Sequence, residues 1–341
     1  MFKIRSLVTA LALAGSVSVA FAWEALPTEA PAPENNPTTA EKVALGQMLY
    51  HDPRLSSTGT VSCASCHNTM LGGEDNRPNS MGVNGQTGGR SAPTVWNAAF
   101  NKVQFWDGRA ASLGDQAAGP VTNPIEMGMK DWNVVVARLK SIDGYEKAFE
   151  KAFGKGDELI SKENATKAIA AYERTLITPN SAFDKYVGGD TSTLTEQQVR
   201  GMKKVEALGC GNCHSGPALN GGGSFQVFPV MADAKLEEKY HFEEDLGLAE
   251  VTKKDADKKK FKVPTLRNIA LTAPYFHNGS VPTLEKAVAV MAKTQLGKDL
   301  TTAETDDVVA FLESLTGQFP KQHMPTLPGT LGRTNNPAQS N

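Results

Sequence analysis

The chain has 341 residues, of which 40% are hydrophobic and 21% charged, with a formal net charge of −2. This near-neutral balance offers no basic surface for nucleic acid, and the length suits two globular domains. All four cysteines lie in two short patterns of the same form, so none remains to form a separate disulfide framework.

The N-terminus has the pattern of a secretory signal. A basic start precedes an apolar run over residues 7–21, and the Ala-Phe-Ala at 20–22 suits a cleavage site. The run is short and rich in Ala, Gly and Ser, so an uncleaved membrane anchor is the less favoured alternative. We therefore predict a signal peptide at 1–22, a periplasmic protein that starts near Trp23, and no membrane span after cleavage.

The first half of the mature chain begins with an arm and a helix. Residues 23–37 contain four prolines and are expected to be extended. Thr38 and Glu41 form a capping-box pattern, which predicts a helix that ends near 51–53. The other elements expected in this half are a long loop over 56–93, short helices over 131–139 and 164–176, and a domain boundary after 178.

The second half repeats this plan. Thr195 and Gln198 form another capping box, and the apolar helical pattern that follows leads directly into a cysteine motif. Thr301 and Glu304 predict the start of a closing helix. Strand signals are sparse, so the fold class is expected to be mainly α, with long loops. The remaining segments expected here are domains over 23–178 and 179–325, a solvated charged loop over 250–260 and an irregular tail over 326–341.

Two C-x-x-C-H patterns use every cysteine of the chain. This is the attachment signature of c-type haem, in which both thiols bond the haem and the histidine becomes an iron ligand. A zinc half-site or a redox pair is the alternative for one copy, but two copies favour covalent attachment of two haems. The predicted haem-binding residues are Cys63, Cys66, His67, Cys210, Cys213 and His214.

The second axial position decides what each iron can do. A histidine–methionine pair leaves iron fully ligated and raises its potential, which suits electron transfer. An open position lets a small oxidant bind. The question is therefore which side chains lie opposite His67 and His214.

Other motifs carry a resemblance to a known family. Six stretches resemble the bacterial di-haem cytochrome c peroxidases: GGEDN at 72–76, APTV at 92–95, QFWDGR at 104–109, NPIEM at 123–127, PTLRN at 264–268 and PYFHNG at 274–279. The resemblance covers residues 40 to 320, in family order. It implies two cytochrome c-like domains, each wrapping one haem. The related methylamine-utilisation enzymes, which oxidise a partner protein, share much of this framework.

The resemblance gives the C-terminal haem the role of electron entry, with a methionine as second ligand. The matching residue is Met291, fourteen positions after His277. By pattern alone Met291 follows Leu284 and Val288 at helical spacing and would be read as core packing. The methylamine-utilisation relatives use a tyrosine in this role, so methionine here favours a peroxidase.

The resemblance makes the N-terminal haem the one that reduces peroxide. Many family members carry a histidine sixteen residues after the proximal histidine, which caps the iron until the other haem is reduced. Here that position is Val83, which cannot bind iron. We therefore expect the haem at His67 to be open or water-bound even when oxidised, with capping by Met81 or Met70 as the alternative.

Three further residues match family positions around the peroxide. Glu126 matches the acid–base glutamate, Gln116 a glutamine that positions peroxide, and Trp106 the tryptophan between the haems. A carboxylate at that place can move a proton between the two peroxide oxygens. Without the resemblance, Glu126 could cap a turn, Gln116 could lie on the surface, and Trp106 could simply be buried at a domain interface.

The family also carries calcium at its domain interface. The matching positions are Ser91, Thr272 and Pro274, the last two through backbone oxygens, which suit a hard cation. Family members often have asparagine where Ser91 stands. His277 is a candidate for contact with a haem edge, with plain packing as the alternative. The remaining histidines are expected on the surface: His51, His241 and His323.

The predicted function is reduction of hydrogen peroxide to water with electrons from a small periplasmic donor, either cytochrome c or a copper protein. One alternative is a methylamine-utilisation-type oxidase that acts on a protein substrate. Another is a non-catalytic di-haem electron carrier, in which both irons are fully ligated. Homodimerisation is expected by analogy with the family.

Overall fold

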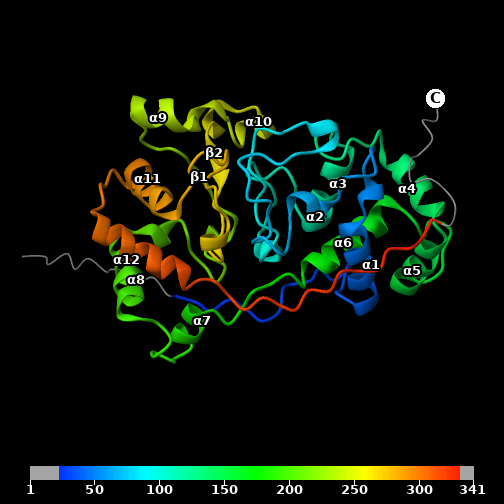
Figure 1. The fold of residues 1–341 in the computed structure, drawn as a ribbon, viewed down its shortest axis with the longest axis horizontal. Helices are drawn as coiled ribbons and strands as arrows, with labels where there is room; N and C mark the ends of the chain where they lie inside the picture. The colour runs from blue at the N-terminus through cyan, green and yellow to red at the C-terminus, as the bar shows by residue number, and fades with distance from the viewer. Residues whose placement is uncertain (1–22, 331–341) are drawn as a thin grey trace, which may run out of the picture.

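The computed structural model describes residues 23–330. Figure 1 shows two helical lobes side by side, joined by long loops. The predicted mainly α fold is confirmed. The helices of the first lobe are α1 (Ala40–His51), α2 (Cys63–Cys66), α3 (Leu113–Thr122), α4 (Trp132–Lys140), α5 (Asp143–Phe153) and α6 (Lys162–Glu173).

The second lobe adds one small sheet to its helices. Its two strands are antiparallel, with Phe225 paired to Lys262 and Val227 to Lys260. The elements of this lobe are α7 (Ala182–Val187), α8 (Glu196–Leu208), β1 (Phe225–Val227), α9 (Ala234–Tyr240), α10 (Ala249–Thr252), β2 (Lys260–Lys262), α11 (Leu284–Leu296) and α12 (Thr302–Glu313).

Two of the three predicted capping boxes mark helix starts correctly. The Thr195 and Thr301 hydroxyls accept hydrogen bonds from the backbone three residues on, and both capping boxes form as predicted. The first helix is shifted by one residue, because Thr39 rather than Thr38 caps it. The Thr38 hydroxyl instead accepts a hydrogen bond of 2.6 Å from Nε of Arg174, after α6. The prediction for Thr38 was therefore wrong by one position.

Each lobe is built on the same close crossing of two helices. A Cβ on Gly46 of α1 would lie 1.9 Å from the carbonyl oxygen of Ala168 and 2.9 Å from Cβ of Tyr172, both in α6. A Cβ on Gly201 of α8 would lie 1.8 Å from the carbonyl oxygen of Asp307 in α12, and 2.9 Å from Cβ of Phe311. Glycine is required at both crossings. Because the two crossings have the same contacts, α1 corresponds to α8 and α6 corresponds to α12.

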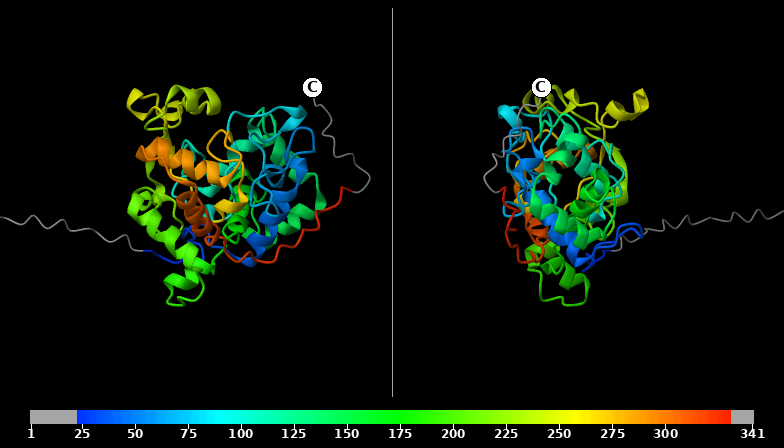
Figure 2. Two further views of the ribbon diagram at one scale, coloured as in Figure 1. Left: turned by 60° about the vertical axis from the view of Figure 1, so that its left-hand side comes forward. Right: turned by 90° about the vertical axis from the view of Figure 1, so that its right-hand side faces the viewer.

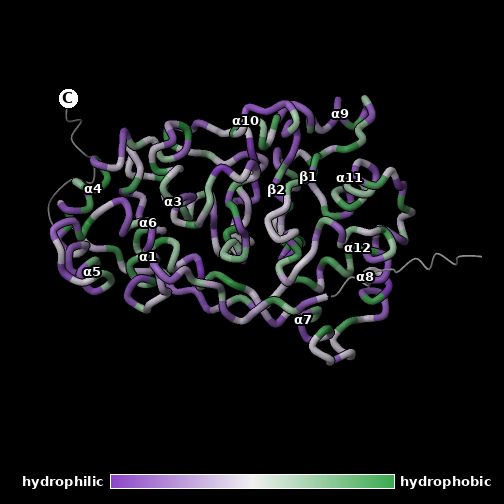
Figure 3. Tube along the Cα trace, turned by 180° about the vertical axis from the view of Figure 1, so that it is seen from behind, coloured by the Kyte–Doolittle hydropathy of each residue, from purple (hydrophilic) through white to green (hydrophobic). Residues whose placement is uncertain are grey.

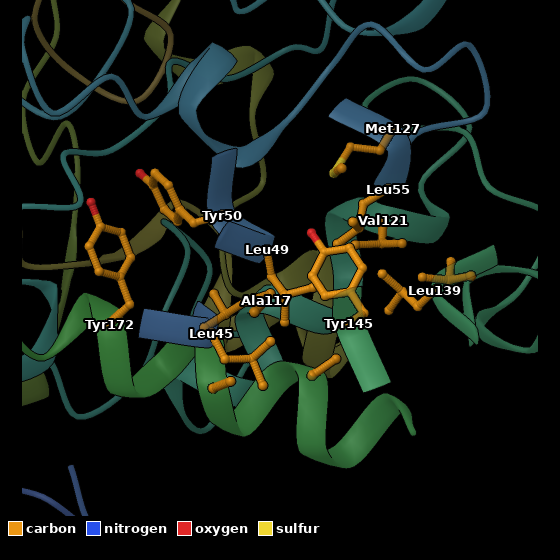
Figure 4. Close-up of a cluster of buried hydrophobic side chains, with 14 of the residues drawn as sticks. Leu45, Leu49, Tyr50, Leu55, Ala117, Val121, Met127, Leu139, Tyr145 and Tyr172 are labelled. Carbon is orange, nitrogen blue, oxygen red and sulfur yellow. The ribbon is translucent and has the colours of Figure 1, made fainter. Parts of the chain in front are cut away.

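The helices of the two crossings contribute to two separate hydrophobic cores, one in each lobe. Figure 4 shows the first core, with Leu45 and Leu49 of α1 among side chains from the neighbouring helices. Phe183 and Phe311 lie in the second core and are fully buried. In Figure 3 the helices carry both apolar and polar residues, as expected for helices with one buried side.

Each end of the described chain packs against the lobe that is distant from it in sequence. Trp23 packs edge-on against Phe183 and Phe311 of the second core, at centroid distances of 5.3 and 5.5 Å. At the other end, Phe319 packs edge-on against Trp96 of the first lobe at 4.8 Å. Figures 1 and 2 show the red C-terminal stretch running along the first lobe. The two segments therefore strap the lobes together.

The N-terminal signal predicted at 1–22 lies outside the described residues. Within residues 23–330, no helix combines the length and apolarity that a membrane crossing needs. The charged segment over 250–260 is mostly exposed, as predicted, although it holds α10 and a short 3-10 turn, and its end enters β2.

Candidate functional site

One cavity of the first lobe collects most of the residues that the sequence singled out. Its wall includes Cys66, His67, Trp106, Gln116 and Glu126. These residues come from α2, from α3 and from the loops on either side of α3. Positions 60 residues apart in the chain are therefore brought to one space.

His67 is oriented for iron binding by its backbone neighbours. Its Nδ1 lies 2.9 Å from the carbonyl oxygen of Pro93, so the proton on that nitrogen is donated to a carbonyl and Nε2 is left to bind a metal. The Tyr50 hydroxyl donates a hydrogen bond of 2.5 Å to the His67 carbonyl oxygen. Burial lowers the pKa of His67, which keeps the ring neutral. With Cys63 and Cys66 one helical turn apart on α2, these residues fit a covalently attached haem.

Glu126 is held at the cavity by the turn that follows α3. Its Oε1 accepts a hydrogen bond of 2.9 Å from Nδ2 of Asn123. Burial raises the pKa of Glu126, while the charge of Arg109 and the Asn123 hydrogen bond oppose that rise. A raised pKa makes this carboxylate a stronger proton acceptor than an ordinary glutamate, which suits acid–base chemistry.

Val83 is fixed away from the cavity. It is 2% exposed and packs in the first core, and its backbone N–H donates a 2.9 Å hydrogen bond to the Glu126 carbonyl oxygen. Met81 and Met70, the alternative ligands, are 50% and 75% exposed and do not line the cavity. None of these three side chains therefore lies in the cavity beside His67.

Trp106 stands where the two lobes meet. Its Nε1 donates a 2.9 Å hydrogen bond to the Ser91 carbonyl oxygen, and its own carbonyl accepts 2.8 Å from the backbone of Lys262 in β2. The Ser91 N–H in turn donates 2.7 Å to the His277 carbonyl oxygen. Backbone bonds from both lobes therefore fix the indole at the junction.

His277 lies in an aromatic cluster beside Trp106. Its ring stacks on Phe261 at 4.3 Å and meets the indole edge-on at 6.4 Å. Burial lowers the pKa of His277 to about 4, so the ring is neutral at physiological pH. Of the other histidines, His241 and His323 are exposed as expected, whereas His51 is half-buried against Tyr50.

The second lobe repeats the orientation of the iron-binding histidine. Nδ1 of His214 lies 3.2 Å from the carbonyl oxygen of Pro264 and 3.3 Å from that of Leu219. Cys210 and Met291 both pack against the second hydrophobic core, and Met291 lies on α11. These contacts fit a second haem, with His214 as one ligand and Met291 within the same core.

The predicted calcium residues lie near the junction. Asn76 Nδ2 donates to the carbonyl oxygens of Leu271 and Ala273, at 3.2 and 3.1 Å. Across the described chain, no protein donor bonds the alternate carbonyls, those of Thr272 and Pro274. Within residues 23–330 no cluster of three His, Cys, Asp or Glu side chains could hold a metal. The carbonyl oxygens of Thr272 and Pro274 are hard ligands of the kind that calcium prefers.

Three charged residues near these sites were missed by sequence reasoning. Arg90 lines the cavity and pairs with Asp107 and, at 2.6 Å, with Asp245 of the second lobe. Lys262 is buried, and burial lowers its pKa to about 8. Glu173, at the end of α6, also lines the cavity. No sequence motif marks Lys262 or Glu173. Glu173 becomes notable only when α6 is aligned with α12 through the crossings at Gly46 and Gly201.

Comparison with known proteins agrees with this geometry. A family model described as "Di-haem cytochrome c peroxidase" matches residues 40–192, and one described as "RoxA-like, cytochrome c-like" matches residues 261–294. The cytochrome c551 peroxidase of Pseudomonas aeruginosa is 43% identical over 93% of this chain and 90% of its own. The chain belongs to the di-haem cytochrome c peroxidase family. It is therefore a peroxidase by class, with haem cofactors.

Other relatives of this peroxidase place it within the family. The cytochrome c peroxidase Ccp of Escherichia coli is 49% identical over 85% of the chain, which spans 61% of that relative's length. The methylamine utilization protein MauG of Methylorubrum extorquens is 35% identical, covering 89% of this chain and 86% of its own. A crystal structure of a MauG-like protein associated with microbial copper homeostasis superposes with a TM-score of 0.76 at 31% identity, over 87% of this chain and 96% of that one.

Proposed function

We propose that this peroxidase reduces hydrogen peroxide to two waters, using two electrons and two protons. The electrons come from a small periplasmic donor, a cytochrome c or a copper protein. The observation that carries the proposal is the cavity that places Glu126 and Gln116 together with His67. An electron carrier has no use for an acid–base group beside its iron.

Five residues at and beside the cavity have distinct tasks in this proposal. Cys63, Cys66 and His67 hold a haem whose iron supplies the electron chemistry when bound. Glu126 takes the proton from the inner peroxide oxygen and returns it to the outer one, which leaves as water. The Gln116 amide orients the peroxide. The Glu126 carboxyl is prepared for this exchange by its raised pKa.

The second lobe provides the entry point for electrons. His214 and Met291 hold its iron fully ligated, which raises its potential. Trp106 lies at the junction of the lobes and relays electrons toward His67. Calcium bound by the Thr272 and Pro274 carbonyls and by Ser91 would stabilise the same junction. The chain is proposed to act in the periplasm, as a homodimer.

Replacing Trp106 with phenylalanine is expected to slow electron transfer between the lobes. Phenylalanine keeps an aromatic ring but loses the indole and its hydrogen bond to Ser91. Rapid-mixing spectroscopy of the half-reduced holoprotein measures the rate directly. Trp132→Phe is the matched control, because that indole donates to the Ala118 carbonyl oxygen within the first lobe. Equal rates in both variants would remove Trp106 from the path.

A steady-state assay tests the function itself. The holoprotein, given reduced cytochrome c and hydrogen peroxide, should oxidise two equivalents of donor for each peroxide consumed. A reduced copper protein is assayed in parallel to identify the donor class. Oxidation of a partner protein without turnover of either donor would favour the oxidase of the methylamine-utilisation type. If neither donor is oxidised when peroxide is added, the protein would instead be a non-catalytic electron carrier.

A further inference from the structure

The two lobes differ in the chemistry of a buried residue next to the helix crossings. The aligned crossings at Gly46 and Gly201 match Tyr172 with Phe311, so the next residue of α6, Glu173, corresponds to Leu312 of α12. Leu312 is 5% exposed and Glu173 is 4% exposed. The lobe proposed to react with peroxide therefore buries a carboxyl group where the electron-transfer lobe buries a hydrocarbon.

Glu173 lies at the cavity without the partners that normally stabilise a buried acid. Its side chain lines the cavity that also contains His67 and Glu126. Its Oε2 is enclosed and, within the described residues, has no hydrogen-bond partner. The neighbouring Arg174 directs its guanidinium elsewhere, donating 2.6 Å to the Thr38 hydroxyl and 2.8 Å to the Asn36 carbonyl oxygen.

The groups around Glu173 do not neutralise a negative charge. Burial raises the pKa of Glu173 to about 8, and the charge of Arg174 only partly opposes that rise. Figure 4 shows Tyr50 and Tyr172 close together at one end of the first core, with their ring centroids 5.1 Å apart. The titratable or charged groups that interact with Glu173 are Tyr50 from α1, Cys63 from α2, and Tyr172 and Arg174 beside it. The other titratable or charged groups on the cavity wall are Cys66, His67, Arg90, Arg109 and Glu126.

Burying such a group is costly, and a leucine would remove the cost. An enclosed carboxyl oxygen without a hydrogen-bond partner destabilises the fold relative to an apolar side chain of similar shape. Leucine occupies the equivalent position of the second lobe, where Leu312 packs in the core. Only the lobe proposed to react with peroxide bears this cost; the electron-transfer lobe has leucine at the equivalent position. Residues that violate folding rules in this way concentrate at functional sites.

We propose that Glu173 stores the proton coupled to the iron held by His67, keeping it while that iron is reduced and releasing it to the cavity when the iron loses an electron. One electron and one proton leave together, so the net charge of the buried site is unchanged. The inference depends on the haem site proposed at His67. It adds a second carboxyl group whose role differs from that of Glu126, because Glu173 compensates charge rather than handling peroxide.

The test is the pH dependence of the midpoint potential of each haem, measured by spectroelectrochemistry of the holoprotein. In the wild type, the potential at His67 should fall between about pH 6 and pH 10, a window around the value of about 8 for Glu173. For each pH unit, the equilibrium constant for reduction of this haem should fall by up to tenfold, which is about 59 mV for one electron. Glu173→Gln should remove this dependence and hold the potential above the wild-type value at alkaline pH, since no carboxylate remains to favour the oxidised iron.

Two further variants make the result decisive. Glu173→Leu copies the residue of the second lobe, so it tests the proposal even if the glutamine variant binds haem poorly. Glu163→Gln, on the exposed side of α6, is the control and should behave as wild type. The haem at His214 is an internal reference whose potential should not change. The proposal is overturned if both Glu173 variants keep the wild-type pH dependence, or if both haems shift equally; failure of peroxide turnover alone would instead reject the proposed function.

Discussion

Replacing Glu126 with glutamine should lower the turnover number for peroxide by about 10²–10⁴-fold, the usual contribution of a positioned acid–base group. Glutamine keeps the shape and the hydrogen bond from Asn123 but cannot accept the peroxide proton. The optical spectra of both haems should be unchanged, because Glu126 binds neither iron in the proposed mechanism. Steady-state kinetics and absorption spectra measure the two effects separately.

The pH profile gives an independent check on Glu126. The carboxyl must be ionised to take the proton, and burial raises its pKa above the ordinary value. Turnover should therefore fall as the pH decreases through that raised pKa, and the glutamine variant should lack this acidic limb. Glu158→Gln, an exposed glutamate of the same lobe, is the control. A glutamine variant at position 126 with near-normal turnover would exclude the acid–base role.

Replacing Met291 with leucine should open the second iron and prevent efficient entry of electrons. Leucine nearly conserves the volume, so α11 should still pack against the second core. Loss of the sulfur ligand lowers the potential, within the range of about 0.8 V that axial ligands control. We expect the low-spin ferric signal of the His214 haem to become high-spin and donor-driven turnover to collapse.

Met202→Leu provides the matched control for Met291. Met202 is buried in the same core on α8 and is 8% exposed, so its replacement tests packing alone. Spin state is read by electron paramagnetic resonance and potential by spectroelectrochemistry. A Met291 variant that retains its low-spin signal and potential would show that another group binds this iron.

The sequence predicted those features that depend on neighbours in the chain. The capping box at Thr195 needs only the residues three positions on, and it formed as expected. The error at Thr38 shows the limit of this reasoning. Two adjacent threonines offer the same hydroxyl, and a distant partner, Arg174, occupies the first of them. A tertiary contact therefore decided which threonine caps the helix.

Contacts between distant segments could not be predicted in the same way. The motif identified His67, but the carbonyl of Pro93 that orients it lies 26 residues away in an irregular loop. The packing of Trp23 on Phe311 of the second core has no local signal. Glu173 sits in an ordinary helical pattern, and it becomes notable only when the crossings at Gly46 and Gly201 align the two lobes.

We propose that the two irons differ in ligation: the one at His214 is fully ligated and the one at His67 is open. Electron paramagnetic resonance of the fully oxidised holoprotein, with and without cyanide, tests it most directly. We expect one low-spin and one high-spin haem, with cyanide converting only the high-spin signal and no prior reduction required. Two low-spin signals that cyanide leaves unchanged, before and after partial reduction, would contradict it.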